Sequence, residues 1–278
     1  MRYTGRGTRR HRHVPLLFWP LTVLLRYLER KLTFKPTSTD YGGLPQHALS
    51  RFRFGRDFGL DLDGAFSDRG SRHAVLFIHG NRHNLTRFRD HYNLFSSLGL
   101  SCMCFDYPGY GRSSGVPSEE GFYASARAAY SFALKELGKE PTDLIVYGCS
   151  MGGAVAIELL QSLPAAALIT ESTFTNSWDM AQHLYPLLPV WRLLPKRFPN
   201  DDRIGNIRIP IGMIHGDQDQ VVPVSMAHEL LKRAPAGTEL HVVPGANHVN
   251  SVTTGGDEVR AFMMRILKPA GANELGDS

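Results

Sequence analysis

The sequence of 278 residues predicts one α/β domain, built on a mostly parallel sheet with helices on both faces. The main observation is that, from about His47 onward, short apolar runs alternate with longer amphipathic stretches. Gly99, Gly138 and Pro164 stand where the helical stretches should end. The composition, 42% hydrophobic and 21% charged without repeats, is typical of a soluble globular protein.

The expected strands are short and apolar. HALSRFRF and LDLDGAF predict a leading antiparallel pair. Six later runs are too short and too apolar for amphipathic helices, which indicates a buried parallel sheet. These runs are residues 74–80, 101–107, 143–150, 166–172, 209–216 and 239–245. Helices are expected between them, near residues 86–98, 118–138, 151–163, 224–234 and 256–267.

Residues 173–208 break this rhythm, because apolar and aromatic residues are mixed there with four prolines. The interval is too long for a plain connection and predicts a small cap inserted beside a functional site. Its large apolar side chains indicate either a surface for an apolar substrate or simple packing of the cap on the domain. These side chains are Trp178, Leu184, Leu187, Leu188 and Trp191.

Residues 1–35 form a separate basic and apolar segment, ahead of a domain expected over 36–270 and a tail over 271–278. The uncharged run 14–25 is shorter than the roughly 20 residues of a membrane span. No small-residue cleavage site of a signal peptide follows it. We expect this segment to bind a membrane surface, facing the cytoplasm, with packing on a cytoplasmic domain as the alternative.

Charge and cysteine content narrow the function classes. The formal net charge is +5, but residues 1–35 carry +8, which leaves −3 for the remainder. The body is therefore not a basic nucleic-acid binder. Cys102, Cys104 and Cys149 are too few for a disulfide framework and are expected to be free thiols.

Gly148-Cys149-Ser150-Met151-Gly152 matches the pattern G-x-S-x-G between a predicted strand and a predicted helix. A sharp strand-to-helix turn needs glycine on either side and lifts the serine hydroxyl above the sheet. This context predicts that Ser150 is a nucleophile. We interpret Cys149 as a small residue beneath the turn, because nothing in the sequence would lower its pKa.

Two backbone amides are expected to stabilise negative charge on a substrate oxygen. One follows the nucleophile, at Met151, and the other follows the earlier strand 74–78, at Asn81. The Asn81 side chain is a candidate for an additional polar contact. His79 is expected to fix this loop, and its spacing from His83 is a weak indication of a metal site.

A serine nucleophile needs a histidine base and a carboxylate that orients it, which follow the elbow in the order Ser, Asp or Glu, His. His248 lies just past the last predicted strand and completes this order. Asp219 is the expected acid. Asp217, in the same loop, and Glu171, at the end of the strand after the elbow helix, are the alternatives.

Six motifs together resemble the α/β-hydrolase superfamily over residues 33–268: HGN, DYPGYGRSSG, GCSMG, ESTF, GDQDQVVP and GANH. HGN and DYPGYGRSSG are most similar to small, membrane-associated abhydrolase-domain proteins, which include esterases and thioesterases. The resemblance implies an α/β-hydrolase fold and hydrolysis of an ester or thioester, without a metal or other cofactor.

The resulting hypothesis is a serine hydrolase that forms an acyl-enzyme on a small ester or acyl substrate. A serine peptidase of the same fold is one alternative, since the same groups cleave amides. A non-catalytic membrane-associated scaffold is the other. The sequence predicts no nucleic-acid partner and does not indicate an oligomeric state.

Overall fold

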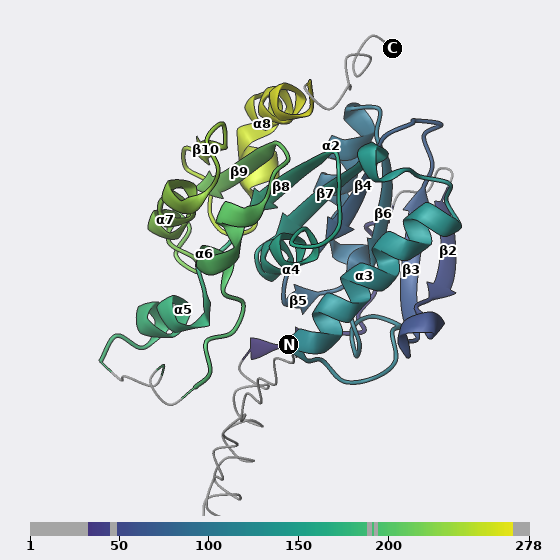
Figure 1. Cartoon of the computed structure of the whole chain (residues 1–278), viewed down its shortest axis with the longest axis horizontal. Coiled ribbons are helices and arrows are strands. Elements are labelled where there is room, and N and C mark those ends of the chain that lie inside the picture. The colour runs from purple at the N-terminus through teal and green to yellow at the C-terminus, as the bar shows by residue number, and fades with distance from the viewer. Residues whose placement is uncertain (1–32, 45–48, 188–190, 192–193, 269–278) are drawn as a thin grey trace, which may run out of the picture.

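The computed structural model describes residues 33–44, 49–187, 191 and 194–268, and it confirms the predicted α/β architecture (Figure 1). Eight strands form one sheet in the order β10-β9-β8-β7-β4-β6-β3-β2. Their bounds are β2 Leu49–Phe54, β3 Leu62–Ser67, β4 Ala74–Ile78, β6 Ser101–Phe105, β7 Leu144–Cys149, β8 Ala167–Glu171, β9 Ile211–Gly216 and β10 Glu239–Val243.

The strand directions follow the sequence prediction. β2 and β3 pair antiparallel, as expected for the leading pair, and β3 also runs antiparallel to β6. All other neighbours in the sheet are parallel. Strands β4, β6, β7 and β8 are buried along their whole length, and most of their residues are apolar on both faces. The carboxyl ends of the parallel strands therefore meet at one edge of the sheet.

Helices cover both faces of this sheet and divide the core in two (Figure 1). One cluster contains the inner faces of α3, α4 and α7, and the other those of α2 and α8. The helix bounds are α2 Arg89–Ser97, α3 Glu119–Lys135, α4 Met151–Leu159, α5 Ser177–Leu184, α6 Asn200–Arg203, α7 Val224–Arg233 and α8 Ser251–Leu267. Short 3-10 turns are η2 Arg56–Phe58, η3 Leu85–Arg87, η4 Pro141–Asp143 and η6 Ile204–Asn206.

Polar side chains define where several helices begin. The Ser118 hydroxyl accepts a hydrogen bond from the Gly121 amide at the start of α3, and Asn176 accepts from two amides at the start of α5. α8 begins earlier than the sequence predicts, at Ser251. Its first turns are separated from the rest by Gly256, whose φ of 43° interrupts the helical backbone. The sequence analysis placed the start of this helix later because two glycines follow Thr253 and Thr254, and glycine disfavours helix interiors.

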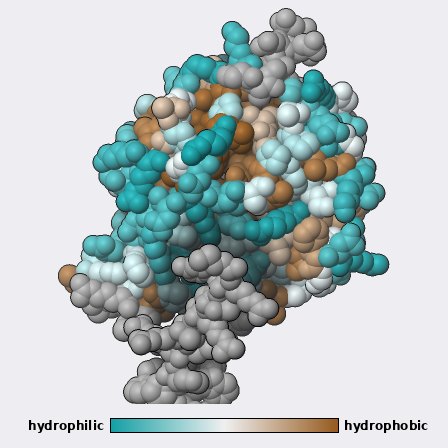
Figure 2. Space-filling model, viewed as in Figure 1, coloured by the Kyte–Doolittle hydropathy of each residue, from teal (hydrophilic) through white to brown (hydrophobic). Residues whose placement is uncertain are grey.

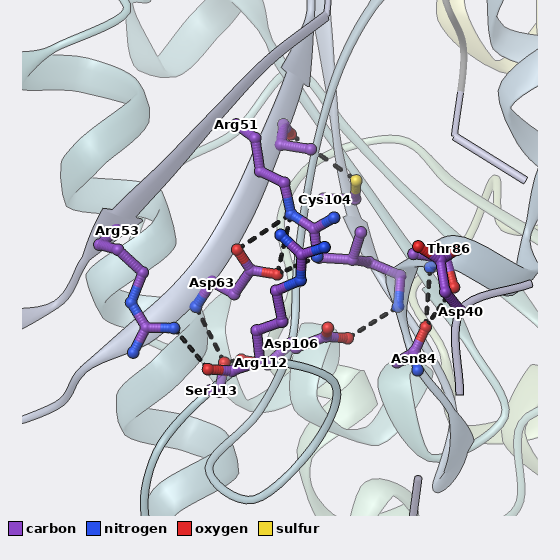
Figure 3. Close-up of polar contacts among 12 residues, drawn as sticks. Asp40, Arg51, Arg53, Asp63, Asn84, Thr86, Cys104, Asp106, Arg112 and Ser113 are labelled. Carbon is purple, nitrogen blue, oxygen red and sulfur yellow. Dashed lines mark hydrogen bonds and ion pairs between the residues drawn. The ribbon is translucent and has the colours of Figure 1, made fainter. Parts of the chain in front are cut away.

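The edge strand β2 is fastened to its neighbours by arginine side chains (Figure 3). Arg51 donates to both oxygens of the buried Asp63, and Arg53 is paired with Asp61. The Ser113 hydroxyl links two backbones, since it accepts from the Asp63 amide and donates to the Asp106 carbonyl. This network fixes the loop that carries DYPGYGRSSG against β3.

The insertion 173–208 contains α5, α6 and η6; α6 packs against α4 and α7, and α5 lies beyond it at the lower left of Figure 1. Among the large apolar side chains that the sequence analysis named here, Trp178 and Leu184 are partly exposed and Leu187 is 92% exposed. Trp191 is half-buried, and Leu188 lies outside the described residues. On the face seen in Figure 2, hydrophilic residues predominate and hydrophobic ones form smaller patches.

Residues 1–32 of the N-terminal segment and the tail 271–278 lie outside the described residues. Within the described part, no helix is long and apolar enough to cross a membrane. The described chain begins beside the carboxyl edge of the sheet, where Lys35–Pro36 (β1) pairs with Arg82–His83 (β5) in a separate two-stranded sheet. The sequence analysis did not predict either of these strands.

Candidate active site

Ser150 occupies a strained turn between β7 and α4. Its φ of 54° and ψ of −118° are unfavourable for a residue with a side chain, and such strain costs about 1–3 kcal/mol. The glycines on either side are sterically required. A Cβ at Gly148 would lie 2.4 Å from the Gly152 carbonyl oxygen, and one at Gly152 would lie 1.9 Å from that of Ile78. The turn therefore has the geometry that the G-x-S-x-G pattern predicts.

Strand β8 holds this turn in place. The Ser150 amide donates to the Glu171 carbonyl oxygen over 2.7 Å, and the Thr173 hydroxyl donates to the Ser150 carbonyl oxygen over 3.3 Å. Met151 is the first residue of α4, so its amide belongs to the helix start, where no intrahelical acceptor exists. That amide is next to the Ser150 side chain in the chain and available to a ligand.

His248 lies between Ser150 and Asp219. Its Nδ1 is 2.8 Å from Asp219 Oδ2, and its Nε2 is 3.1 Å from Ser150 Oγ. An ionised carboxylate only accepts hydrogen bonds, so Nδ1 carries the proton of the neutral ring and Nε2 is left as an acceptor. The Ser150 hydroxyl then donates to Nε2. The structure thus brings three residues from three loops into one hydrogen-bonded chain.

The environment of Asp219 favours its ionised form. Burial opposes ionisation, but hydrogen bonds from His215, His248 and the Val222 amide hold the pKa of Asp219 well below its ordinary value. The Val221 and Val222 amides both donate to Oδ1 over 2.9 Å. Because Oδ1 is held by the backbone, Oδ2 is fixed in direction toward His248.

Asp217, the first alternative acid, does not contact His248. Its Oδ1 accepts from the Gly245 amide over 2.7 Å, on the exposed side of the loop. The Gln218 amide donates to the Ala246 carbonyl oxygen in the same region. Asp217 therefore joins the loop that carries Asp219 to the loop that carries His248.

Glu171, the second alternative acid, is buried under the elbow and is bound elsewhere. His91 Nε2 and the Tyr147 hydroxyl each lie 2.7 Å from Glu171 Oε2 and donate to it. Burial opposes its ionisation, but these partners, His91 first, hold the pKa of Glu171 below its ordinary value. Glu171 is thus paired with His91, which the sequence analysis did not single out.

Cys149 lies within the same buried group. Its sulfur and the ligand atoms of His91 and Glu171 all lie within 4.8 Å of one another, a spacing that could hold a metal ion. His91 and Glu171 already satisfy each other by a hydrogen bond. Burial raises the pKa of the Cys149 thiol well above its ordinary value, so the thiol is neutral at physiological pH. This agrees with the interpretation of Cys149 as a small residue beneath the turn.

The 79–86 loop lies directly against the nucleophile. A Cβ at Gly80 would be 3.3 Å from Ser150 Cβ. His79 Nδ1 lies 2.8 Å from the Gly80 carbonyl oxygen, which shares a planar peptide unit with the Asn81 amide. His79 Nε2 is 3.2 Å from the buried Asp106. His79 is thus a loop-fixing residue, and the direction of the Asn81 amide is set by its contact.

The Asn81 side chain is used inside the protein. Its amide nitrogen donates to the Thr33 carbonyl oxygen over 2.7 Å, a contact with the chain's own N-terminal arm that the sequence analysis did not predict. His83 Nδ1 contacts the Tyr41 hydroxyl over 3.0 Å, so this ring also has an internal partner. Neither His79 nor His83 belongs to a group of potential metal ligands among the described residues.

Comparison with known proteins gives consistent findings. A family model described as "Alpha/beta hydrolase family" matches residues 75–205. The α/β-hydrolase domain-containing protein 17C of Xenopus tropicalis is 33% identical over 236 residues, covering 83% of this chain and 72% of that protein. The lysophosphatidylserine lipase ABHD12 of Danio rerio is 33% identical over 198 residues, covering 63% of this chain and 50% of that protein.

Among solved structures, an esterase of Pyrococcus furiosus superimposes with a TM-score of 0.71. The match covers 85% of this chain and 98% of the esterase, at 19% sequence identity. At that identity the similarity concerns the fold.

Proposed function

The chain belongs to the α/β-hydrolase family, and from that premise we propose that it is a serine hydrolase that cleaves carboxylic esters or thioesters through an acyl-enzyme intermediate. The observation that carries the proposal is the chain of hydrogen bonds from Ser150 through His248 to Asp219, with contacts of 3.1 and 2.8 Å. Both distances lie within the hydrogen-bonding range that a nucleophile, base and orienting acid need.

In the proposed first step, Ser150 Oγ attacks the acyl carbonyl carbon and His248 Nε2 takes the hydroxyl proton. The imidazolium that forms is stabilised by Asp219, whose environment keeps the carboxylate ionised. His248 then returns the proton to the departing alcohol or thiol. In the second step, water activated by His248 hydrolyses the acyl-enzyme and frees Ser150.

The negative oxygen of each tetrahedral intermediate would be held by the amides of Met151 and Asn81. The first starts α4, where the helix dipole adds to its effect. The second is in the loop that contacts Ser150 at Gly80. Removing one donor of this kind costs about 10²–10³ in kcat, so their orientation matters as much as the nucleophile's.

Ester or thioester substrates with apolar acyl groups are supported by two features. The name of one relative, lysophosphatidylserine lipase, describes ester cleavage. The cap also exposes apolar side chains, notably Leu184 and Leu187. We propose that this surface accommodates the acyl chain, with no metal or cofactor in the reaction.

We further propose that residues 1–35 bind a membrane surface from the cytoplasmic side, because they combine a charge of +8 with an uncharged apolar run. Co-sedimentation with anionic vesicles should be lost when residues 1–32 are removed. Unchanged co-sedimentation of the shortened chain would contradict this proposal.

The decisive experiment is a hydrolysis profile of the purified protein on p-nitrophenyl esters and acyl thioesters of graded chain length. Ser150→Ala and His248→Ala are measured alongside. We expect both variants to lose kcat to a similar extent, and the double variant to lose little more, because the residues act as one unit. A folded wild-type protein that is inert on every ester and thioester would refute the proposal and favour a peptidase or a scaffold.

A further inference from the structure

The N-terminal arm of the described chain follows the 79–86 loop closely. We call residues 33–43 the strap. β1 and β5 pair in parallel, with Lys35 opposite Arg82 and Pro36 opposite His83. The strap therefore lies beside the loop that contains Asn81, one of the two proposed oxyanion donors.

Strap residues hold Asn81 at both its backbone and its side chain. The Lys35 amide donates to the Asn81 carbonyl oxygen over 3.0 Å, and the Asn81 side chain donates to the Thr33 carbonyl oxygen over 2.7 Å. The Tyr110 hydroxyl also donates to the Asn81 carbonyl oxygen, over 2.8 Å. With the peptide unit before Asn81 fixed by His79, these bonds leave the Asn81 backbone little freedom.

The contacts continue along the loop beyond Asn81. The buried Asn84 side chain donates to the carbonyl oxygens of Thr37 and Thr39, over 3.1 and 2.8 Å. Its own Oδ1 accepts from Thr86, as Figure 3 shows. Thr86 in turn accepts from the Tyr41 amide through its hydroxyl. The strap thus provides hydrogen-bond partners from Asn81 to Thr86.

An aromatic anchor ties the strap to the core. Phe34 is 8% exposed, and its ring lies 4.9 Å from that of Phe122. Phe122 stacks on Tyr107 at 3.6 Å and contacts the ring of Tyr110 edge-on. The hydroxyl that supports the Asn81 carbonyl oxygen therefore comes from the same aromatic cluster that buries Phe34.

From these contacts we propose that the strap is a positioning element of the active site, which holds the Asn81 amide in the direction needed to bind the oxyanion. This inference rests on the proposed function. Its key groups are the Lys35 backbone amide and the Tyr110 hydroxyl, neither of which touches the substrate. Residues 1–32 precede the strap directly in the sequence. The segment proposed to bind a membrane is therefore continuous with the segment proposed to position Asn81.

The test compares Lys35→Pro with Lys35→Ala. Both remove the lysine side chain, but only proline removes the backbone N–H that bonds Asn81. Tyr110→Phe is the second variant, since it keeps the buried ring and removes the hydroxyl. The measurements are kcat and KM on a p-nitrophenyl ester, the inhibition constant of an arylboronic acid, thermal unfolding, and hydrogen exchange of peptides spanning 79–86.

We expect Lys35→Pro to lower kcat about tenfold or more relative to Lys35→Ala, with KM nearly unchanged, because an oxyanion donor acts in the transition state. The boronic acid forms a tetrahedral adduct on Ser150, so its affinity should fall by a similar factor. Tyr110→Phe should change both quantities in the same direction. Exchange of the 79–86 amides should be faster in Lys35→Pro.

Equal kcat in Lys35→Pro and Lys35→Ala would overturn the proposal, even if the proline variant melts at a lower temperature. A loss that appears in KM alone would also overturn it. If the wild-type protein hydrolyses no ester, the proposed function fails. Hydrogen exchange then tests separately whether the strap holds the 79–86 loop. Unchanged exchange of the 79–86 amides in Lys35→Pro would then show that the strap does not hold the loop.

Discussion

Two of the carboxylate–histidine pairs in the described part of the chain meet beside the nucleophile elbow, Asp219 with His248 and Glu171 with His91. Their contacts are almost equal in length, 2.8 and 2.7 Å. They differ in what surrounds the imidazole. The His248 side chain is 17% exposed and its second nitrogen meets Ser150, whereas His91 is packed among aromatic rings beneath the elbow.

The comparison teaches that the pair itself does not define a catalytic base. The proposed base needs a ring nitrogen that faces the nucleophile, and of these two histidines only His248 has one. The pair under the elbow instead joins α2, β7 and β8 through Glu171, whose carbonyl oxygen accepts from the Ser150 amide. One pair should therefore serve the reaction and the other the stability of the turn.

The largest expected difference is in turnover. Asp219→Asn should lower kcat by about 10³–10⁴, because the amide no longer holds His248 in the required tautomer. Glu171→Gln, the matched change in the other pair, should keep kcat within about tenfold of the wild type. Steady-state kinetics of the two variants on one ester measure this. Equal losses in both would mean that the two pairs are not functionally distinct.

Stability should show the reverse order. His91→Leu leaves the buried Glu171 carboxylate with only the Tyr147 hydroxyl as a side-chain partner and should cost about 3–5 kcal/mol in the free energy of unfolding. His248→Leu should cost less, about 1 kcal/mol, because Asp219 keeps its hydrogen bonds from the Val221 and Val222 amides. Chemical denaturation gives both values. A small effect of His91→Leu would show that the pair does not stabilise the turn.

The two carboxylates should also make stability depend on acid pH. Each has a pKa below its ordinary value in the folded protein, so each contributes stability that is present above about pH 4–5 and lost as pH falls through the folded pKa. The free energy of unfolding of the wild type should therefore decrease below about pH 4. Asp219→Asn and Glu171→Gln should each flatten this dependence, because each removes a carboxylate whose pKa is lowered in the folded protein. An unchanged pH dependence in either variant would contradict this expectation.

The smallest effect is expected at Cys149, which lies between the two pairs. Cys149→Ala should keep kcat within about threefold, because the neutral thiol takes no part in the proposed chemistry. The native protein should also resist inactivation by iodoacetamide under conditions that modify the unfolded chain. Rapid inactivation of the native protein would contradict both expectations.

The sequence predicted the sheet and the loops at its carboxyl edge because these features are local. Apolar runs mark the strands, and Ser150, Asp219 and His248 each follow one of them directly. His91 could not be found in this way, since it sits in an amphipathic helix and meets a residue 80 positions away. The strap was missed for a related reason: two-residue strands have no periodicity, and β1 and β5 are joined across 47 positions.

The tight packing at Gly148 and Gly152 limits which substitutions the protein tolerates during evolution. No other side chain fits at either position without moving backbone, so a deep mutational scan should find both closed to substitution. Cap residues such as Leu184 and Leu187 face outward and carry no such constraint. Under the proposed function, new substrate preferences would then arise by substitutions in the cap, while the geometry around Ser150 is kept.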